Sequence, residues 1–330
     1  MKEFKKYLKK LKKQPVLVVS HESPDGDAIG SSIGMGFLLK ELGFEPLVIN
    51  KDLVPEKYSF LENNIKIKKL DDLNQNEKLE KYLVFVMDSG KLDRIGFVLE
   101  DIFPKYVGII NIDHHISNDF FGIKNFVYPK MAATSEIVGS LFLDLIGYIP
   151  SEAATAIYTG VMTDTGNLTY ESTTSATVAL VSILHEMNAD FNSMRKFVYE
   201  NESIGQIAGV RAILNNLDYL MDGYIAYTYL NYEDILANNL TAGDIENYVD
   251  YPRKVSTSEV AILFKEFTKD EIRISIRTKS KIDANKMAAG FGGGGHKRAA
   301  GFRIKKPLNE AIKFALNKIV EGLKNNEWNN

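Results

Sequence analysis

The chain has 330 residues, a formal net charge of −3, 45% hydrophobic residues and 25% charged residues. These values are typical of a globular protein with two domains of ordinary size, and they exclude a disordered or fibrous chain. No apolar run approaches the roughly 18 residues that span a bilayer, and the lysine-rich first thirteen residues do not resemble a secretory leader. Because the chain has no cysteine, disulfides, thiolate metal sites and a cysteine nucleophile are excluded, and we expect a cytoplasmic protein.

The first half of the chain alternates aliphatic runs with helical patterns, which is typical of parallel βαβ units. An amphipathic first helix within residues 1–14 is expected to pack on its own domain and not on a membrane. The expected strands are Val16–Val19, Leu47–Asn50, Tyr82–Met87 and Val107–Ile112. The expected helices run from Asp27 to about Gly43 and over Thr134–Leu145, Ser151–Thr163 and Ser175–Met187. Three glycines in the first of these helices are poor helix formers, and we expect them to allow close approach to the sheet.

The pattern changes after Asn188. Mixed helical residues lead into a second set of alternating, strand-like segments: Tyr224–Leu230, Val260–Phe264 and Ile272–Ile276. A glycine-rich turn and an amphipathic helix over Asn309–Leu323 follow. We therefore predict an α/β protein with a parallel-sheet domain over 1–187, a helical linker over 188–210 and a smaller mixed-sheet domain over 211–330. The active site is expected in the cleft between the two domains.

Ionisable residues follow three of the four expected strands of the first domain. They are His21, Asp25 and Asp27 after the first strand, Asp88 after the third, and Asp113, His114 and His115 at the end of the fourth. A further aspartate, Asp164, lies where a helix meets a glycine turn. Ligands of open parallel sheets bind beyond the carboxyl ends of the strands, so we expect these side chains to meet at one edge.

The five aspartates of this group have no local surplus of lysine or arginine. Such crowded carboxylates are costly unless they are neutralised, and two divalent cations would neutralise them. Carboxylate oxygens with imidazoles and without sulfur suit Mn²⁺ or Mg²⁺ better than a structural zinc ion. The sequence thus predicts a two-metal site.

A basic, glycine-rich segment stands near the C-terminus. Between Arg273 and Lys306 there are ten lysines and arginines and one acidic residue, Asp283. Four consecutive glycines, Gly292–Gly295, lead into His296, and a backbone without side chains can bring its N–H groups close to an anion. The segment predicts a local site for an anionic substrate. It is not a P-loop, because no Gly-Lys-Ser/Thr follows.

Several of these blocks resemble the motifs of a known family. SHESPDGDAIGSS, MDSGKLDRIG, IDHH and TDTG are similar, in this order, to the motifs of the DHH phosphoesterase superfamily. The block SIRTKSKIDANKMAAGFGGGGHKRAAGF is similar to its DHHA1 substrate-binding domain. The size of the chain resembles the stand-alone nanoRNase and 3′-phosphoadenosine 5′-phosphate (pAp) phosphatase branch.

The resemblance implies a role for each motif residue. It implies that His21, Asp25 and Asp88 hold one metal, that Asp27, His114 and Asp164 hold the other, and that Asp88 bridges the two. It gives Asp113 the task of orienting a histidine and His115 a position facing the phosphate or its leaving group. Substrate contacts are implied for Ser275, Arg277, Gly293, Gly294, Gly295 and His296.

The resemblance also implies an activity. The expected reaction is hydrolysis of very short oligoribonucleotides to mononucleotides, of pAp to AMP, or of both, with Mn²⁺ preferred and Mg²⁺ allowed. Hydrolysis of cyclic di-AMP or linear pApA is the alternative. A RecJ-like exonuclease, a family II pyrophosphatase and a nucleic-acid-binding module without catalysis fit the sequence less well. The expected partners are short RNA or such nucleotides and not a membrane, and a homodimer is left open.

Overall fold

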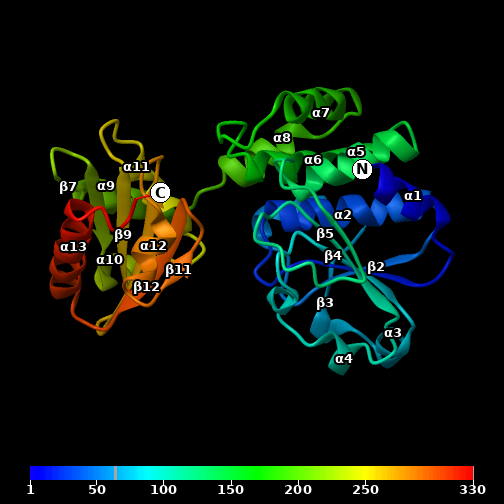
Figure 1. The fold of residues 1–330 in the computed structure, drawn as a ribbon, viewed down its shortest axis with the longest axis horizontal. Coiled ribbons are helices and arrows are strands. Elements are labelled where there is room, and N and C mark those ends of the chain that lie inside the picture. The colour runs from blue at the N-terminus through cyan, green and yellow to red at the C-terminus, as the bar shows by residue number, and fades with distance from the viewer. Residues whose placement is uncertain (63–64, 330) are drawn as a thin grey trace. The chain divides into compact units, whose positions relative to one another are not determined.

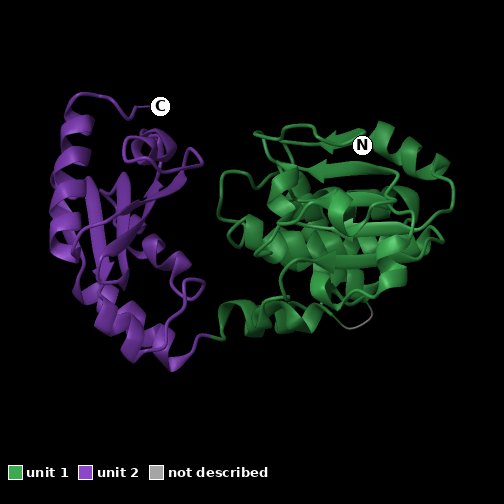
Figure 2. Cartoon of the chain, turned by 90° about the horizontal axis from the view of Figure 1, so that it is seen from below, with its two compact units in different colours: residues 1–201 green, residues 202–330 purple. Residues whose placement is uncertain are grey.

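The computed structural model describes residues 1–62 and 65–329. The chain divides into two compact units, Met1–Asn201 and Glu202–Asn330, drawn in green and purple in Figure 2. Each unit has its own sheet and its own apolar core. The division between them falls inside the stretch 188–210 that the sequence suggests as a linker, and helical residues precede and follow it.

The described part of unit 1 contains one six-stranded parallel sheet in the order β3-β2-β1-β4-β5-β6 (Figure 1). The strands are β1 (Val16–Val19), β2 (Pro46–Asn50), β3 (Lys68–Lys69), β4 (Leu83–Met87), β5 (Gly108–Asp113) and β6 (Lys124–Val127). The four expected strands are present within one residue of their predicted bounds. The two short edge strands, β3 and β6, were missed because segments of only two and four residues, Lys-Lys and Lys-Asn-Phe-Val, carry no aliphatic run.

Helices cover both faces of this sheet. They are α1 (Lys2–Lys10), α2 (Gly26–Glu41), α3 (Gln75–Leu79), α4 (Leu99–Ile102), α5 (Thr134–Leu145), α6 (Ser151–Asp164), α7 (Ser175–Glu186) and α8 (Phe191–Met194). Shorter turns are η1 (Glu56–Leu61), η2 (Leu70–Asp72), η3 (Leu92–Ile95) and the π-helical η4 (Arg195–Tyr199).

Alternate residues of β1 lie in two different cores. Val16 and Val18 pack in the core that includes α2, α5 and α6, whereas Leu17 and Val19 pack in the core that includes η3 and α4. Burial on both faces explains why the central strands read as continuous aliphatic runs. The first helix, α1, packs on its own unit as expected, because Phe4 stacks on Phe126 with 4.0 Å between ring centroids.

The glycines of α2 allow helices to approach one another more than they allow contact with the sheet. A Cβ atom on Gly30 would lie 2.4 Å from the carbonyl oxygen of Ala156 in α6, and one on Gly34 would lie 2.8 Å from Ile157. Gly36 alone of the three faces a strand residue, Val48 of β2. The expectation of close approach was right, but its main partner is α6.

Gly30→Ala should therefore destabilise the protein by about 1–3 kcal/mol, the usual cost of overpacking a core. Alanine is the better helix former by about 1 kcal/mol, but the overlap outweighs this gain because a helix carbonyl cannot move aside alone. Thermal denaturation of the two proteins measures the difference. Gly243→Ala is the control, because its added Cβ would meet no atom nearer than 3.8 Å. An unchanged or raised midpoint for Gly30→Ala would contradict the packing argument.

The described part of unit 2 contains a six-stranded mixed sheet in the order β11-β12-β10-β9-β8-β7. Its strands are β7 (Asp218–Leu220), β8 (Ile225–Leu230), β9 (Val260–Thr268), β10 (Glu271–Thr278), β11 (Gly294–Gly295) and β12 (Ala299–Ile304). Neighbouring strands pair antiparallel except β8 and β9, which pair parallel. The α/β class with a parallel sheet followed by a mixed sheet is confirmed.

Helices of unit 2 pack on both faces of this sheet. They are α9 (Ile204–Asn215), α10 (Tyr232–Ala237), α11 (Asp250–Arg253), α12 (Ala284–Ala289) and α13 (Leu308–Lys324), with the turn η5 (Glu246–Val249). One core joins α12 and α13 to β9, β10 and β12, and another joins α9, α10 and η5 to β8 and β9. Across the described residues of both units, no helix combines the length and the apolar character needed to cross a membrane.

Candidate active site

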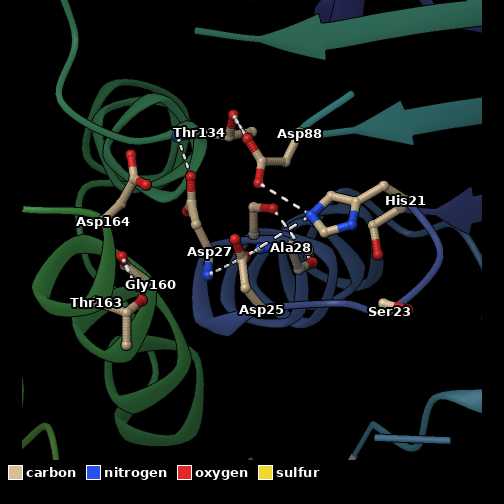
Figure 3. A network of polar contacts seen from close by, with 12 residues as sticks. His21, Ser23, Asp25, Asp27, Ala28, Asp88, Thr134, Gly160, Thr163 and Asp164 are labelled. Atoms are coloured by element: carbon tan, nitrogen blue, oxygen red, sulfur yellow. Dashed lines mark hydrogen bonds and ion pairs between the residues drawn. The ribbon is translucent and has the colours of Figure 1, made fainter. Parts of the chain in front are cut away.

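The strands that carry the predicted ligands are neighbours in the sheet. The order of strands reverses between β1 and β4, and β5 lies beside β4. His21 comes soon after β1, Asp88 directly after β4, and Asp113 is the last residue of β5. A reversal of this kind opens a crevice at the carboxyl ends of the strands, and the N-terminus of α2 and the end of α6 bring the remaining aspartates there (Figure 3).

One group of potential metal ligands consists of His21, Asp25 and Asp88, whose ligand atoms all lie within 4.8 Å of one another. The Nε2 atom of His21 is 3.8 Å from Oδ1 of Asp25 and 3.9 Å from Oδ2 of Asp88. Asp25 is also the N-cap of α2, where its Oδ1 accepts hydrogen bonds from the amides of Asp27 and Ala28. The capping role explains why this aspartate is held at the start of a helix.

A second group consists of Asp27, His114 and Asp164, within the same limit of 4.8 Å. Nε2 of His114 is 3.3 Å from Oδ2 of Asp164 and 3.7 Å from Oδ1 of Asp88. Asp88 thus presents Oδ2 to the first group and Oδ1 to the second. It is buried, and its φ of +52° is left-handed, a conformation that aspartate and asparagine adopt more readily than most residues. Asp88 therefore lies between His21 of the first group and His114 of the second.

Asp113 lies beside these groups but belongs to neither. Its Oδ1 is 2.6 Å from Nδ1 of His115 and accepts the backbone N–H of His114, and its Oδ2 accepts from the side chain of Asn118. His115 also forms a third group with Asp88 and His114. The arrangement fits an aspartate that orients a histidine. The sequence did not point to Asn118, which lies three residues beyond the DHH triplet.

The electrostatics of the cluster favour bound cations. Burial, together with the charge of Asp88, raises the pKa of Asp27 to about 7, and burial with the charges of Asp27 and Asp88 raises the pKa of Asp164 to about 9. Burial also raises the pKa of Asp88. In the described part of the chain, the ion pairs of these aspartates come only from histidines. Carboxylates kept this close and compensated only by histidines are typical of a divalent cation site, so the donor set fits two such ions.

The predicted substrate residues lie in unit 2. Ser275 and Arg277 alternate with buried isoleucines along β10, so they share one face of the sheet. Arg273 lies on the same face and is directly opposite Lys265 of β9 and Arg303 of β12. We call Lys265, Arg273, Arg277 and Arg303 the cationic face. Like charges directly opposite each other are destabilising. The carboxylate of Glu271 offsets part of this repulsion, because its Oε1 is 3.9 Å from Nε of Arg273 and 3.4 Å from Nη1 of Arg303, and a bound anion would offset more of it.

Lys265 is the most enclosed member of the cationic face. Its Nζ donates a hydrogen bond of 2.7 Å to Oγ of Ser275. Burial lowers its pKa to about 8, and the charges of Arg277 and Arg273 act in the same direction. The sequence analysis missed Lys265, Arg273 and Arg303. The alternation Arg273, Ser275, Arg277 could have predicted that Arg273 lies beside the two expected substrate residues, because side chains two residues apart on a strand share a face.

The glycine run lies beside this face at the sheet edge. Its last two glycines, Gly294 and Gly295, form β11 and pair with β12, and His296 begins the turn to Ala299. A pocket of about 420 Å³ lies here. Its lining residues are Arg273, Ile274, Phe291, Gly292, Gly293, Gly301, Phe302 and Arg303. Of the six predicted substrate residues, the structure places Gly293 in this lining and the other five outside it.

In unit 1, aspartates and histidines meet where the strand order of a parallel sheet reverses. Unit 2 follows in the chain and carries the cationic face. This combination is that of a metal-dependent phosphoesterase. Residues 15–161 match the N-terminal domain of the DHH family, and residues 222–325 match the DHHA1 domain. The chain belongs to the DHH family of phosphoesterases, and it carries the DHHA1 domain as well. The resemblance of its motifs to this superfamily is confirmed.

Three known proteins are similar to most of this chain. The bifunctional oligoribonuclease and PAP phosphatase NrnA of Thermus thermophilus is 30% identical over 94% of this chain and 90% of its own length. The crystal structure of an exopolyphosphatase-related protein from Bacteroides fragilis has a TM-score of 0.88 and 29% identity, over 99% of this chain and 96% of the other. The cyclic-di-AMP phosphodiesterase PdeA of Listeria monocytogenes is 26% identical over 88% of this chain but only 45% of its own length.

Proposed function

We propose that this chain hydrolyses very short oligoribonucleotides to mononucleotides and pAp to AMP, with two divalent cations, Mn²⁺ before Mg²⁺. The position of Asp88, with one carboxylate oxygen toward each ligand group, supports the two-metal chemistry most directly. The match to the Thermus oligoribonuclease and PAP phosphatase along nearly the whole chain supports the choice of substrates. In this proposal residues 1–187 carry the chemistry and residues 211–330 bind the rest of the substrate.

The geometry supports the roles that the resemblance of the motifs implies. His21, Asp25 and Asp88 would hold one cation, and Asp27, His114 and Asp164 the other, with Asp88 shared. When bound, such cations polarise a phosphoryl oxygen and lower the pKa of coordinated water, which supplies the attacking hydroxide. His115 keeps Nδ1 on Asp113, so Nε2 is the atom that can face the phosphate or the leaving oxygen. No side chain of the protein needs to act as the nucleophile.

The substrate is expected to be anionic and small. Ser275, Arg277, Gly293, Gly294, Gly295 and His296 are proposed to bind its far phosphate or nucleotide, and we add Arg273 and Arg303 because they line the pocket beside Gly293. Ser275, Arg273, Arg277 and Arg303 share one sheet face, and so compact a set of contacts suits a substrate with few phosphates better than a long strand. A cytoplasmic location remains a prediction of the sequence, and the sequence leaves a homodimer open.

Hydrolysis of cyclic di-AMP or pApA is the second candidate function. The similarity to the Listeria cyclic-di-AMP phosphodiesterase over 88% of this chain favours it. That relative is about twice as long as the part that matches, so its whole activity need not belong to this chain. The chemistry at the metal groups would be the same for both candidates, and the substrate alone would differ.

A single panel of substrates tests the proposal. The purified full chain is assayed with Mn²⁺ on pAp, an RNA dimer, an RNA 24-mer, cyclic di-AMP, pApA and pyrophosphate at equal concentrations. We expect pAp and the dimer to be hydrolysed fastest. A 24-mer degraded as fast as the dimer would indicate an exonuclease instead, and preference for cyclic di-AMP or pApA would select the second candidate. Turnover of pyrophosphate alone, or of nothing, would contradict both functions.

A further inference from the structure

The first residues of α5 and the loop that leads into it contact three of the proposed metal ligands, although none of these residues is itself a proposed ligand. We call residues 131–135 the ligand-facing segment. The amides of Thr134 and Ser135 donate hydrogen bonds of 2.7 and 2.8 Å to the two carboxylate oxygens of Asp27. The carbonyl oxygen of Met131 is 3.3 Å from Nδ1 of His114. Both oxygens of Asp27 and the far nitrogen of His114 are thereby fixed from one side.

Thr134 makes a further contact through its side chain. The hydroxyl Oγ1 donates a hydrogen bond of 3.0 Å to Oδ1 of Asp88 (Figure 3). The threonine is fully buried. This is the same carboxylate oxygen that faces His114 at 3.7 Å. The hydroxyl therefore sets the rotation of the Asp88 carboxylate, with Oδ1 toward the second ligand group and Oδ2 toward His21.

The ligand-facing segment is itself held in place through hydrogen bonds of Glu136. Glu136, in the first turn of α5, is buried, and its Oε2 accepts hydrogen bonds from the amide of Ala132 at 2.7 Å and the hydroxyl of Thr177 at 3.2 Å. Thr177 belongs to the capping box of α7. The ligand-facing segment is thus tied to α5 and α7, and its backbone is held in place independently of the Asp88 carboxylate.

We propose that Thr134 is a positioning residue that holds Asp88 in the orientation needed to bridge two cations. This rests on the proposed two-metal function. A carboxylate free to rotate would have to be ordered when the cations bind, whereas a hydrogen bond from a rigid loop orders it beforehand. Partners of metal ligands typically contribute roughly 10- to 100-fold in metal affinity. The hydroxyl is expected to act at that scale on Mn²⁺ binding, before any substrate is present.

The test is calorimetric titration of the full-length, metal-free protein with MnCl₂ alone. Thr134→Val keeps the shape and the backbone N–H to Asp27 but removes the hydroxyl, and we expect it to weaken Mn²⁺ binding roughly 10- to 100-fold. Thr134→Ser restores the hydroxyl and should bind nearly as the wild type does. Thr159→Val is the matched control, because this fully buried threonine of α6 donates to the carbonyl of Thr155 and touches no proposed ligand. Thermal denaturation without metal shows which variants are folded.

Equal Mn²⁺ affinity in the wild type and folded Thr134→Val would overturn the inference, as would a Thr134→Ser variant no better than Thr134→Val. If Thr134→Val does not fold, Thr134→Ala replaces it in the comparison with Thr134→Ser, and the same outcomes decide. A wild-type protein that binds no Mn²⁺ would overturn the two-metal function itself, and with it this role of Thr134. Failure of the Thr134 role and failure of the two-metal function can therefore be told apart by whether the wild-type protein binds Mn²⁺.

Discussion

Replacing Asp88 should abolish hydrolysis of every phosphoester substrate. This carboxylate lies between both ligand groups, so its loss disturbs both cations, and each cation is worth several kcal/mol of transition-state stabilisation. We expect kcat/KM to fall by roughly 10³-fold or more. Asp88→Asn is a cleaner variant than Asp88→Ala, because asparagine tolerates the left-handed φ of +52° whereas alanine adds backbone strain.

The measurement compares kcat/KM for an RNA dinucleotide and for bis-p-nitrophenyl phosphate, a minimal diester with no second phosphate. Asp93→Ala serves as the control, since this nearby aspartate of η3 is exposed and lies outside all three ligand groups. We expect both Asp88 variants to lose both activities and the control to keep them. Near wild-type rates in a folded Asp88→Asn protein would remove the bridging assignment.

Substitutions in unit 2 should lower the hydrolysis of the dinucleotide but not of bis-p-nitrophenyl phosphate, whereas substitution of Asp88 should lower both. Arg277→Ala and His296→Ala remove only binding energy that a second phosphate or nucleotide can use. A charged contact contributes on the order of 1.5–3 kcal/mol, so hydrolysis of the dinucleotide should fall roughly 10- to 100-fold in kcat/KM. Hydrolysis of bis-p-nitrophenyl phosphate should stay nearly unchanged, because this substrate has no second phosphate or nucleotide for those groups to bind.

The control for this experiment is Lys305→Ala, an exposed cation next to β12 and outside the cationic face. It should leave both activities as they are and so exclude a general effect of net charge. If Arg277→Ala or His296→Ala, shown to be folded, lost both activities equally, unit 2 would take part in the chemical step. The proposed division of labour between the two units would then be wrong.

The central part of the fold, and the meeting of the proposed ligands at one edge of the sheet, could be predicted from local patterns. Aliphatic runs such as Val16–Val19 mark buried parallel strands, and a histidine or aspartate directly after such a run has to lie at the carboxyl edge of the sheet. The edge strands β3 and β6 could not be read in this way, since Lys68–Lys69 and Lys124–Val127 gain their strand geometry from the neighbour they pair with.

Contacts between residues that are distant in the sequence could not be predicted from the sequence either. Thr134 and Glu136 look like ordinary first-turn residues of a helix, and their contacts with Asp88 and Thr177 depend on how α5 packs in the finished unit. Lys265 was missed for the same reason, because a single lysine in an apolar strand shows its partner Ser275 only when β9 and β10 are in register. The local spacing of residues predicts which face of a strand or helix a side chain lies on and where the element ends. The contacts of Thr134, Glu136 and Lys265 are set by tertiary packing instead.

In the sequence, the proposed ligands extend from His21 to Asp164 and so span most of unit 1. A nascent chain would therefore leave the ribosome with an incomplete site until α6 has been synthesised and has docked on α2. Contacts so distant in sequence form late in folding. Cations that bind only the finished arrangement would then stabilise it by mass action, and metal uptake would report that the domain has reached its native topology.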